Sequence, residues 1–585
     1  MADVKLAVPN LASQLAGPVT KLRQRTTGPL ILELDLTDGL AEGPPQDPVS
    51  ALLTMRRMRL PDLLEGLKRA SGDDRVRALV VRVGGSRLGL AKIQELRSAI
   101  ISFRQSGKLA VAWAETFGDF VRGNLPYYLA TAFDRIYLQP SGTLGLTGVA
   151  VEQVFLHDAL AKLGVGFQSA KRHEYKSAAD QFTETGFTGP AREAAKRLTE
   201  SVAEQLIAGI AEGRRKTPEQ ARELLTRGPF LARQALDEGL VDVLGYRDEV
   251  YEQVHKEAGA DAMLLYLQRY QRSHALTELP RRLPRSPRER FVAVIYAHGA
   301  IRHGRSGRGP IGGGGMGSDT VAAALRAAAG DERARAIVLR VNSPGGSYTA
   351  SDVIWREVVR LRAAGKPVIV SMGDVAASGG YFIAAPADVI VAQPGTITGS
   401  IGVILGKPVL RDMFGRSGVN VETVAEGENA TMFSSSRPFS DSEWERINAW
   451  LDAVYEDFTG KVASGRGMSP ERVHELGRGR VWTGADAVGN GLADEAGGLH
   501  DAIEIARRRA GLPSDAPVRV YPRLSPLDQL RPAESSETRP AAAAAAITGL
   551  AGLFADGWGP AWQLAARAGL PPYGPLMLPG IWRIS

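Results

Sequence analysis

The sequence predicts an α/β protein made of two tandem homologous domains, each a mainly parallel sheet covered by helices. The first observation is an internal repeat: residues 75–83, RVRALVVRV, match residues 333–341, RARAIVLRV, and both are typical of a strand after a polar turn. Further along, residues 127–149 align with residues 381–403 without a gap. In both copies strands alternate with helix-compatible stretches, which indicates βαβ units and parallel strands.

The elements follow the same order in both copies. Each copy opens with an apolar strand, in residues 30–40 and 291–301. The repeated strand is followed by Gly-Gly-Ser, a helical stretch, Gly-Lys and a further strand. A helix-rich segment comes later, in residues 190–227 and 441–477. We therefore divide the chain into an N-terminal extension, a first domain, a basic linker, a second domain and a C-terminal tail: residues 1–27, 28–275, 276–290, 291–534 and 535–585.

Composition excludes several kinds of site. The chain of 585 residues contains no cysteine, so disulfides, a thiolate nucleophile and zinc–thiolate sites are impossible. The eight histidines lack metal-ligand spacing, and no metal or cofactor is expected. The glycines at 312–315 lack the Lys-Ser/Thr ending of a phosphate-binding loop and predict a mobile loop. Residues 281–290 are basic without aromatic residues, which favours a solvated linker over a nucleic-acid site.

No segment is typical of a membrane span or a signal peptide. Residues 1–24 have no continuous apolar core, and no stretch reaches the roughly 18 apolar residues that a spanning helix needs. The tail, residues 535–585, is rich in Ala and Pro and contains three tryptophans. It is compatible with an oligomer surface, a peripheral membrane contact or disorder.

Ser378 is the candidate nucleophile. Residues 368–370 form a short apolar run typical of a buried strand, residues 376–380 predict a small-residue turn, and a helix-compatible run begins at Tyr381. A serine between a strand and a helix has an unobstructed hydroxyl beside backbone N–H groups. The alternative is that the small residues only allow close helix packing and that Ser378 is a spectator.

A reciprocal loss between the copies favours the catalytic interpretation. The gapless alignment sets an offset of 254 residues, which pairs Ser378 with Asn124 and Lys176 with Ala430. The first copy therefore keeps a lysine without the serine, and the second keeps the serine without the lysine. This is the pattern expected if duplicated domains share one Ser–Lys site. The alternative is a solvated surface lysine.

The chemistry requires a neutral lysine and an oxyanion hole. A free lysine titrates near 10.4, so burial between the domains must lower the pKa of Lys176 before it can act as a general base. The expected oxyanion donors are the N–H of Gly379 and an N–H of the glycine turn at Gly345 and Gly346. Ser400 is a candidate for orienting the lysine amine.

These motifs resemble the signal peptide peptidase A family, peptidase family S49, in its long tandem form. The resemblance covers roughly residues 28–510 and is most specific in VNSPGGS, ASGGY, TGSIGV and YKSA. It implies the Clp protease/crotonase fold, with Ser378 as nucleophile, Lys176 as general base and Ser400 bonded to that lysine. It also implies a homotetramer and membrane-associated cleavage of hydrophobic peptides such as remnant signal peptides. Many long members begin with a membrane anchor, which is not visible here, so a cytoplasmic location is the alternative.

Other functions stay open at the sequence level. A crotonase-like acyl-CoA enzyme would use the same glycine turn and would not need Ser378. A non-catalytic scaffold for membrane proteins would use the aromatic tail as its contact. A serine peptidase with His298 or His303 as base is the weakest alternative, because no aspartate is evidently placed to orient either ring.

Overall fold

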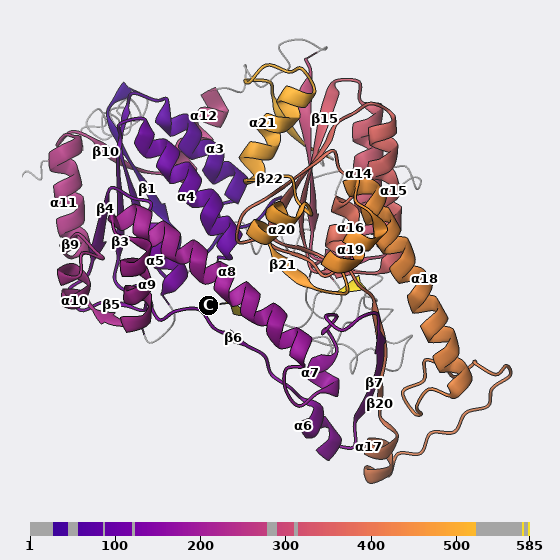
Figure 1. Cartoon of the computed structure of the whole chain (residues 1–585). Coiled ribbons are helices and arrows are strands. Elements are labelled where there is room, and N and C mark those ends of the chain that lie inside the picture. The colour runs from indigo at the N-terminus through magenta and orange to yellow at the C-terminus, as the bar shows by residue number, and fades with distance from the viewer. Residues whose placement is uncertain are drawn as a thin grey trace, which may run out of the picture.

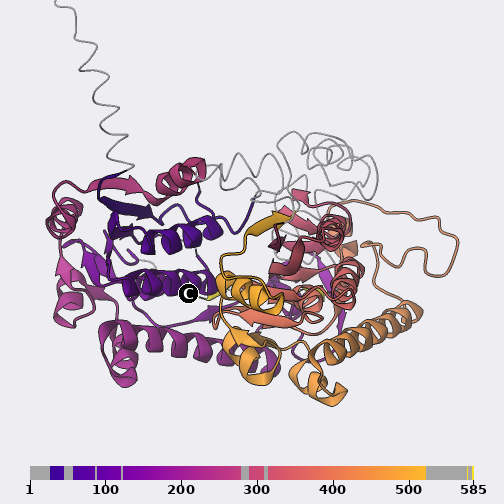
Figure 2. The ribbon, with the colours of Figure 1, turned by 90° about the horizontal axis from the view of Figure 1, so that it is seen from above.

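The computed structural model contains two α/β units side by side (Figures 1 and 2). The first copy is coloured indigo to magenta and the second pink to yellow. The described residues are 27–44, 57–85, 88–119, 123–277, 289–308, 314–521, 576–577 and 583–584.

The first copy is built on a six-stranded parallel sheet with the order β10-β1-β2-β3-β4-β9. Its strands are nearly continuous apolar runs because both faces of the sheet are covered. Their bounds are β1 Leu30–Asp35, β2 Val76–Arg82, β3 Leu109–Ala114, β4 Arg135–Leu138, β9 Val243–Leu244 and β10 Met263–Tyr266. The helices of this copy are α3 Leu60–Ser71, α4 Leu90–Gln105, α5 Asn124–Ala130, α6 His157–Lys162, α7 Asp180–Thr183, α8 Gly189–Arg214, α9 Pro218–Arg227, α10 Ala232–Asp237, α11 Arg247–Ala258 and α12 Leu267–Thr277.

The second copy repeats this plan with the order β21-β19-β17-β15-β11-β23, and β18 and β22 branch from β17. Only β19 and β21 pair antiparallel in this sheet, among the described residues. The strands are β11 Phe291–His298, β15 Ala334–Ser343, β17 Val368–Ala377, β18 Val389–Ala392, β19 Ile397–Gly399, β21 Val481–Thr483, β22 Glu495–Ala496 and β23 Val518–Tyr521. The helices are α14 Ser318–Gly330, α15 Tyr348–Ala363, α16 Gly379–Ala384, α17 Arg411–Arg416, α18 Asp441–Arg466, α19 Pro470–Leu476, α20 Gly484–Asn490 and α21 Leu499–Arg509.

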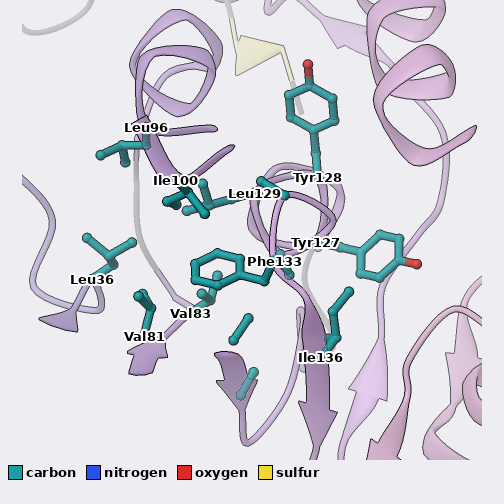
Figure 3. Close-up of a cluster of buried hydrophobic side chains, with 14 of the residues drawn as sticks. Leu36, Val81, Val83, Leu96, Ile100, Tyr127, Tyr128, Leu129, Phe133 and Ile136 are labelled. Carbon is teal, nitrogen blue, oxygen red and sulfur yellow. The ribbon is translucent and has the colours of Figure 1, made fainter. Parts of the chain in front are cut away.

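Each sheet buries apolar side chains on both faces. In the first copy the larger core lies under α3, α4, α5 and α8, and the smaller one lies under α11. The second copy has the same division, with α21 over the smaller core. Figure 3 shows part of the larger first core, where Phe133 lies among Val83, Ile100 and Leu129. The alternation of strand residues between the two faces follows from the period of two in a strand.

The repeat extends to individual contacts. The Tyr127 hydroxyl donates to the Leu240 carbonyl at 2.7 Å, and the Tyr381 hydroxyl donates to the Leu492 carbonyl at 2.8 Å. These tyrosines occupy equivalent positions in the two copies, and each ties the helix after the third long strand to the turn that ends α10 or α20. The two copies therefore share this hydrogen bond between equivalent residues.

An arm made by both copies projects from the body, at the lower right of Figure 1. Its centre is an antiparallel pair between β7 of the first copy and β20 of the second, in which Lys171 pairs with Ile404. The helices α6 and α17 lie at its end. The remaining short strands are β5 Thr143–Leu144, β6 Val151–Glu152, β7 Gly166–Lys171, β8 Phe230–Leu231, β12 Ala300–Arg302, β13 Gly307–Arg308, β14 Gly314–Gly317, β16 Gly345–Gly346, β20 Ile404–Val409, β24 Leu576–Met577 and β25 Arg583–Ile584.

The predicted fold class, two tandem homologous α/β domains of the Clp protease/crotonase type, is confirmed. Two local predictions are wrong. The strand that starts at Val368 continues to Ala377, because its second half pairs with β19. The glycines at 314 and 315 lie in strand β14, which pairs with β12, rather than in a loop. The domain boundaries stay predictions, and the N-terminal extension, the linker and the tail lie largely outside the described residues.

Candidate active site

Ser378 occupies a strained turn between β17 and α16. Its φ of 54° and ψ of −117° are unusual for a residue with a side chain. Two backbone bonds hold this conformation: the Ser378 N–H donates to the Gly399 carbonyl at 2.8 Å, and its carbonyl accepts from Phe382 at 2.8 Å. The turn is thus fixed by the neighbouring strand β19 on one side and by the first turn of the helix on the other. Such a strand–turn–helix junction is a usual position of the nucleophile in α/β enzymes.

Lys176 reaches Ser378 from the other copy. It follows β7 in the arm, and its amine lies 2.8 Å from the Ser378 hydroxyl. The same amine contacts the Ser400 hydroxyl at 2.9 Å and the Ser400 carbonyl at 3.0 Å. All three side chains are fully buried. Residues far apart in the sequence, and from two domains, therefore share one hydrogen-bonded cluster.

Burial lowers the pKa of Lys176 well below its ordinary value. Loss of hydration is the single cause, because the charged amine is removed from water. Both serine partners are neutral, and neither provides the negative charge that would stabilise an ammonium. The surroundings therefore favour the neutral amine, which is the form that accepts a proton.

Ser400 is held in an unusual backbone conformation of its own. Its φ is 52°, and it follows Gly399 with φ of 76° at the end of β19. Its N–H donates to the Arg480 carbonyl at 2.7 Å. The structure therefore presents both the hydroxyl and the carbonyl of Ser400 to the lysine amine.

The glycine turn lies against the residue after the serine. A Cβ placed on Gly379 would lie 3.1 Å from the Gly346 nitrogen and 3.2 Å from the Gly345 Cα. The Gly345 N–H donates to the Ser343 hydroxyl at 3.1 Å, so it is already used. The assignment of Gly345 as an oxyanion donor stays a prediction. Gly346 and Gly379 are the pair that the geometry brings together.

A turn at residues 477–480 is the functional segment that the sequence analysis missed. The Arg478 carbonyl accepts from the Tyr175 N–H at 3.1 Å, and the Gly479 N–H donates to the Ile401 carbonyl at 2.7 Å. A Cβ on Gly479, whose φ is 85°, would lie 2.5 Å from the backbone nitrogen of Lys176. The turn thus holds the lysine segment against the Ser400 segment. Its only signal in the sequence is Gly-Arg-Gly-Arg, which any surface turn can contain.

Asn124, the residue of the first copy that corresponds to Ser378, has a structural role. Asn124 begins α5, as Ser378 precedes α16. The Asn124 amide donates to the Gly148 carbonyl at 2.8 Å and accepts from the Thr147 N–H at 3.0 Å. Its side chain therefore fastens a loop and contains no nucleophile.

The candidate histidine bases lie elsewhere. His298 is buried against the ring of Tyr296, and burial lowers its pKa to about 4. His303 contacts the hydroxyls of Ser347 and Thr349 at 3.1 and 2.7 Å. Within the described residues neither histidine bonds to Ser378, and no group of three or more acidic or histidine side chains is arranged to hold a metal ion.

The fold and this cluster define the class of protein: a tandem α/β protein with a buried serine–lysine pair between its domains. A family model described as peptidase family S49 matches residues 102–261 and 360–513. The chain is 33% identical over 460 residues to "Protease 4" of Salmonella typhi, covering 77% of this chain and 72% of that protein. "Protease 4" of Haemophilus influenzae is 31% identical over 479 residues, with coverage of 80% and 75%.

A plant protein is also similar. "Serine protease SPPA, chloroplastic" of Arabidopsis thaliana is 31% identical over 460 residues, which cover 78% of this chain and 66% of that protein. The chain belongs to peptidase family S49. The family predicted from the motifs is confirmed, and so is the coarser part of the predicted function, a serine protease. Among the described helices, none is both long enough and apolar enough to cross a membrane.

Proposed function

We propose that the protein is a serine endopeptidase whose catalytic dyad is Ser378 and Lys176. The observation that carries this proposal is the 2.8 Å contact between the Lys176 amine and the Ser378 hydroxyl inside a fully buried cluster. A neutral amine has two N–H donors and one lone pair. The carbonyl and hydroxyl of Ser400 accept the two N–H bonds, which leaves the lone pair for the hydroxyl hydrogen of Ser378.

The reaction follows from this arrangement. The Ser378 oxygen attacks the peptide carbonyl carbon while its proton passes to the Lys176 amine. The N–H groups of Gly379 and Gly346 stabilise the negative oxygen that develops. The intermediate then collapses, the peptide C–N bond breaks, and Lys176 returns the proton to the leaving amine. Water activated by the same lysine hydrolyses the acyl ester on Ser378.

The test compares three variants on fluorogenic apolar peptides. We expect Ser378→Ala and Lys176→Ala to lose at least a thousandfold in kcat/KM, because residues of one catalytic unit are each indispensable. Ser177→Ala is the matched control, since Ser177 is the buried neighbour of the lysine and has no role in the proposed reaction. Circular dichroism confirms that each variant is folded. Near-wild-type activity in Lys176→Ala would show that another base is used.

The Ser378→Ala variant and labelling by serine-directed reagents distinguish the peptidase from the other candidate functions. A crotonase-like acyl-CoA enzyme keeps its activity in Ser378→Ala, and a scaffold is not labelled by serine-directed reagents. The lysine contact at Ser378 favours the peptidase, because neither alternative requires a neutral base beside that hydroxyl. Remnant signal peptides are the proposed substrates on the basis of the family resemblance.

Assembly as a homotetramer with a peripheral membrane contact is also part of the proposal. Exposed apolar side chains on the arm segments support a contact with a partner or an apolar surface. They are Val154, Leu163, Val419, Val421, Val424 and Phe433. Light scattering after size-exclusion chromatography measures the oligomer, and flotation with liposomes measures the membrane contact. A monomer that stays with the soluble fraction would contradict both parts.

A further inference from the structure

Ser351 of α15 is a fully buried polar side chain that lies beside the candidate oxyanion hole. Its hydroxyl oxygen lies 2.8 Å from the point where a Cβ on Gly379 would be, and the backbone nitrogen of Gly346 lies 3.1 Å from the same point. Gly379 and Gly346 are the two residues whose N–H groups are the proposed oxyanion donors. The hydroxyl of Ser351 therefore lies where these two residues meet.

The same hydroxyl holds Ser347, the residue that follows Gly346. It donates to the Ser347 carbonyl at 2.7 Å, and the Ser351 N–H donates to this carbonyl at 3.0 Å. The Ser347 N–H in turn donates to the Ile301 carbonyl at 2.9 Å. Ser347 is thus held by α15 through its carbonyl and by β12 through its N–H, which fixes the orientation of the end of the glycine turn.

The first copy has no hydroxyl at the position that corresponds to Ser351. The helices α4 and α15 both contain 16 residues, with Gly89 and Ser347 as their N-caps, so the corresponding residue is Ile93. Ile93 is buried, and its N–H donates to the Gly89 carbonyl at 3.1 Å, which repeats the backbone bond of Ser351. The hydroxyl is therefore a feature of the copy that has the candidate nucleophile.

The stability of the helix does not by itself favour a serine at position 351. A serine that bonds to the carbonyl one turn back slightly destabilises a helix, and a buried hydroxyl needs such a bond to offset its lost hydration. An apolar residue at this position, such as Ile93 in the first copy, avoids both effects. The serine is small, however, and lets Gly379 and the glycine turn approach one another, whereas we expect a side chain as large as that of Ile93 to push them apart.

We propose that Ser351 is a positioning residue of the oxyanion hole, which holds the glycine turn against Gly379 so that the N–H groups of Gly346 and Gly379 face the same oxygen. The inference rests on the proposed peptidase function. Ser351 acts through the two glycines rather than on the substrate itself. Its effect is therefore largest in the transition state, in which the carbonyl oxygen becomes negatively charged.

The first experiment removes the hydroxyl in Ser351→Ala. We expect kcat for a fluorogenic apolar peptide to fall about tenfold with KM nearly unchanged, because misplaced donors lose less than the hundredfold or more that loss of a whole donor causes. Ser71→Ala is the matched control, since the Ser71 hydroxyl donates to the Leu67 carbonyl at 2.9 Å in the same manner, in α3 of the first copy. The control keeps the wild-type kcat, and an equal kcat in Ser351→Ala overturns the proposal.

The second experiment compares two inhibitors with the same apolar peptide sequence. The serine oxygen bonds to the carbon of a peptide aldehyde while its proton passes to Lys176, and the aldehyde oxygen becomes the oxyanion. The corresponding peptide alcohol has no carbonyl group and forms no such adduct. We expect Ser351→Ala to weaken inhibition by the aldehyde about tenfold, in parallel with kcat, and to leave inhibition by the alcohol unchanged. Equal weakening of both inhibitors would show a general structural role and overturn the proposal.

The third experiment does not depend on catalysis. Hydrogen exchange measured by mass spectrometry on peptides that span residues 343–351 reports how firmly the glycine turn is held. We expect severalfold faster exchange in Ser351→Ala and wild-type exchange in Ser71→Ala. If no protein hydrolyses peptides but this difference is present, the peptidase function fails while the positioning of the turn by Ser351 stands. Unchanged exchange in Ser351→Ala contradicts the positioning role.

Discussion

At the scale of single residues, the decisive feature is a lysine kept neutral by its surroundings. Lys176 is fully buried, and among the described residues its amine hydrogen-bonds only to the hydroxyl of Ser378 and to the hydroxyl and carbonyl of Ser400. Burial without a carboxylate lowers the pKa of this lysine well below its ordinary value. The same lysine on the surface would be protonated at neutral pH and would be useless as a base.

This environment predicts the pH dependence of the activity. Below its pKa, Lys176 carries a proton and cannot accept the one from Ser378, so kcat/KM falls tenfold for each unit of pH. Above its pKa the amine is neutral and kcat/KM reaches a plateau. We therefore expect one acidic limb with a midpoint well below the ordinary lysine value, measured in a pH–rate profile.

The absence of cysteine allows that limb to be assigned to one atom. Lys176→Cys introduces a unique thiol, and alkylation with bromoethylamine produces a lysine analogue whose amine is a weaker base. We expect the alkylated protein to regain activity with its acidic limb at lower pH, while the untreated variant stays inactive. A limb that does not move, or a midpoint near 10.5, would contradict the role of this amine.

At the scale of elements, the turn at residues 477–480 joins the two halves of the site. Its backbone bonds to the lysine segment at Tyr175 and to the serine segment at Ser400 and Ile401. The Arg480 guanidinium lies over the Tyr175 ring at 5.0 Å and pairs with Glu193 at 2.9 Å. The turn therefore holds the Lys176 segment in position against the Ser400 segment.

Gly479→Ala tests this positioning role. Gly479 has φ of 85°, and a Cβ there would lie 2.5 to 2.6 Å from Lys176 backbone and side-chain atoms. We expect kcat to fall about a hundredfold, because a displacement of about 1 Å at a catalytic group has that effect. We expect KM to change much less than kcat, because the displaced group is the proposed base Lys176.

Gly467→Ala is the matched control for the backbone strain. Gly467 also has positive φ, at 61°, but nothing lies within 4 Å of its Cβ position. Both variants lose about 1 kcal/mol of stability from the unfavourable conformation. Equal kcat values in the two variants would show that the turn only contributes to stability.

At the scale of the whole molecule, a buried charge network and one helix join the two copies. Arg340 of β15 pairs with Glu42 at 2.8 Å and with Glu95 at 2.6 Å, both from the first copy. Helix α8 crosses to the second copy (Figure 1), where Arg197 pairs with Asp486 at 2.8 Å. Because the proposed dyad has one member in each copy, we expect activity only while this interface holds.

Arg340→Met tests the interface. The substitution leaves buried Glu95 without its cation and leaves Glu42 with Lys92 alone, and breaking such a buried pair costs about 3–5 kcal/mol. We expect a loss of this size in the free energy of unfolding, measured by urea denaturation. Arg335→Met on the same strand is the control, because Arg335 is exposed and its loss changes stability by less than about 0.5 kcal/mol. Equal stability of the two variants would contradict the role of the network.

The sequence by itself determined the repeat, the order of strands and helices, and the serine and lysine that the two copies divide between them. These features follow from local periodicity and from the constant offset between the two copies, which pairs Ser378 with Asn124. The strand–turn–helix around Ser378 is predictable for the same reason. The length of strand β17 is not predictable from the sequence, because its second half depends on pairing with β19.

Only the tertiary structure decided which groups meet. It placed the glycine turn of Gly345 and Gly346 against Gly379 and bonded the Gly345 N–H to the Ser343 hydroxyl. It placed the turn around Gly479 against Lys176 and paired β24 with β16. These contacts join segments separated by hundreds of residues, and neither periodicity nor residue type encodes their register. The physical reason is that backbone hydrogen bonds and close glycine packing depend on relative position in space, which the assembled sheets alone define.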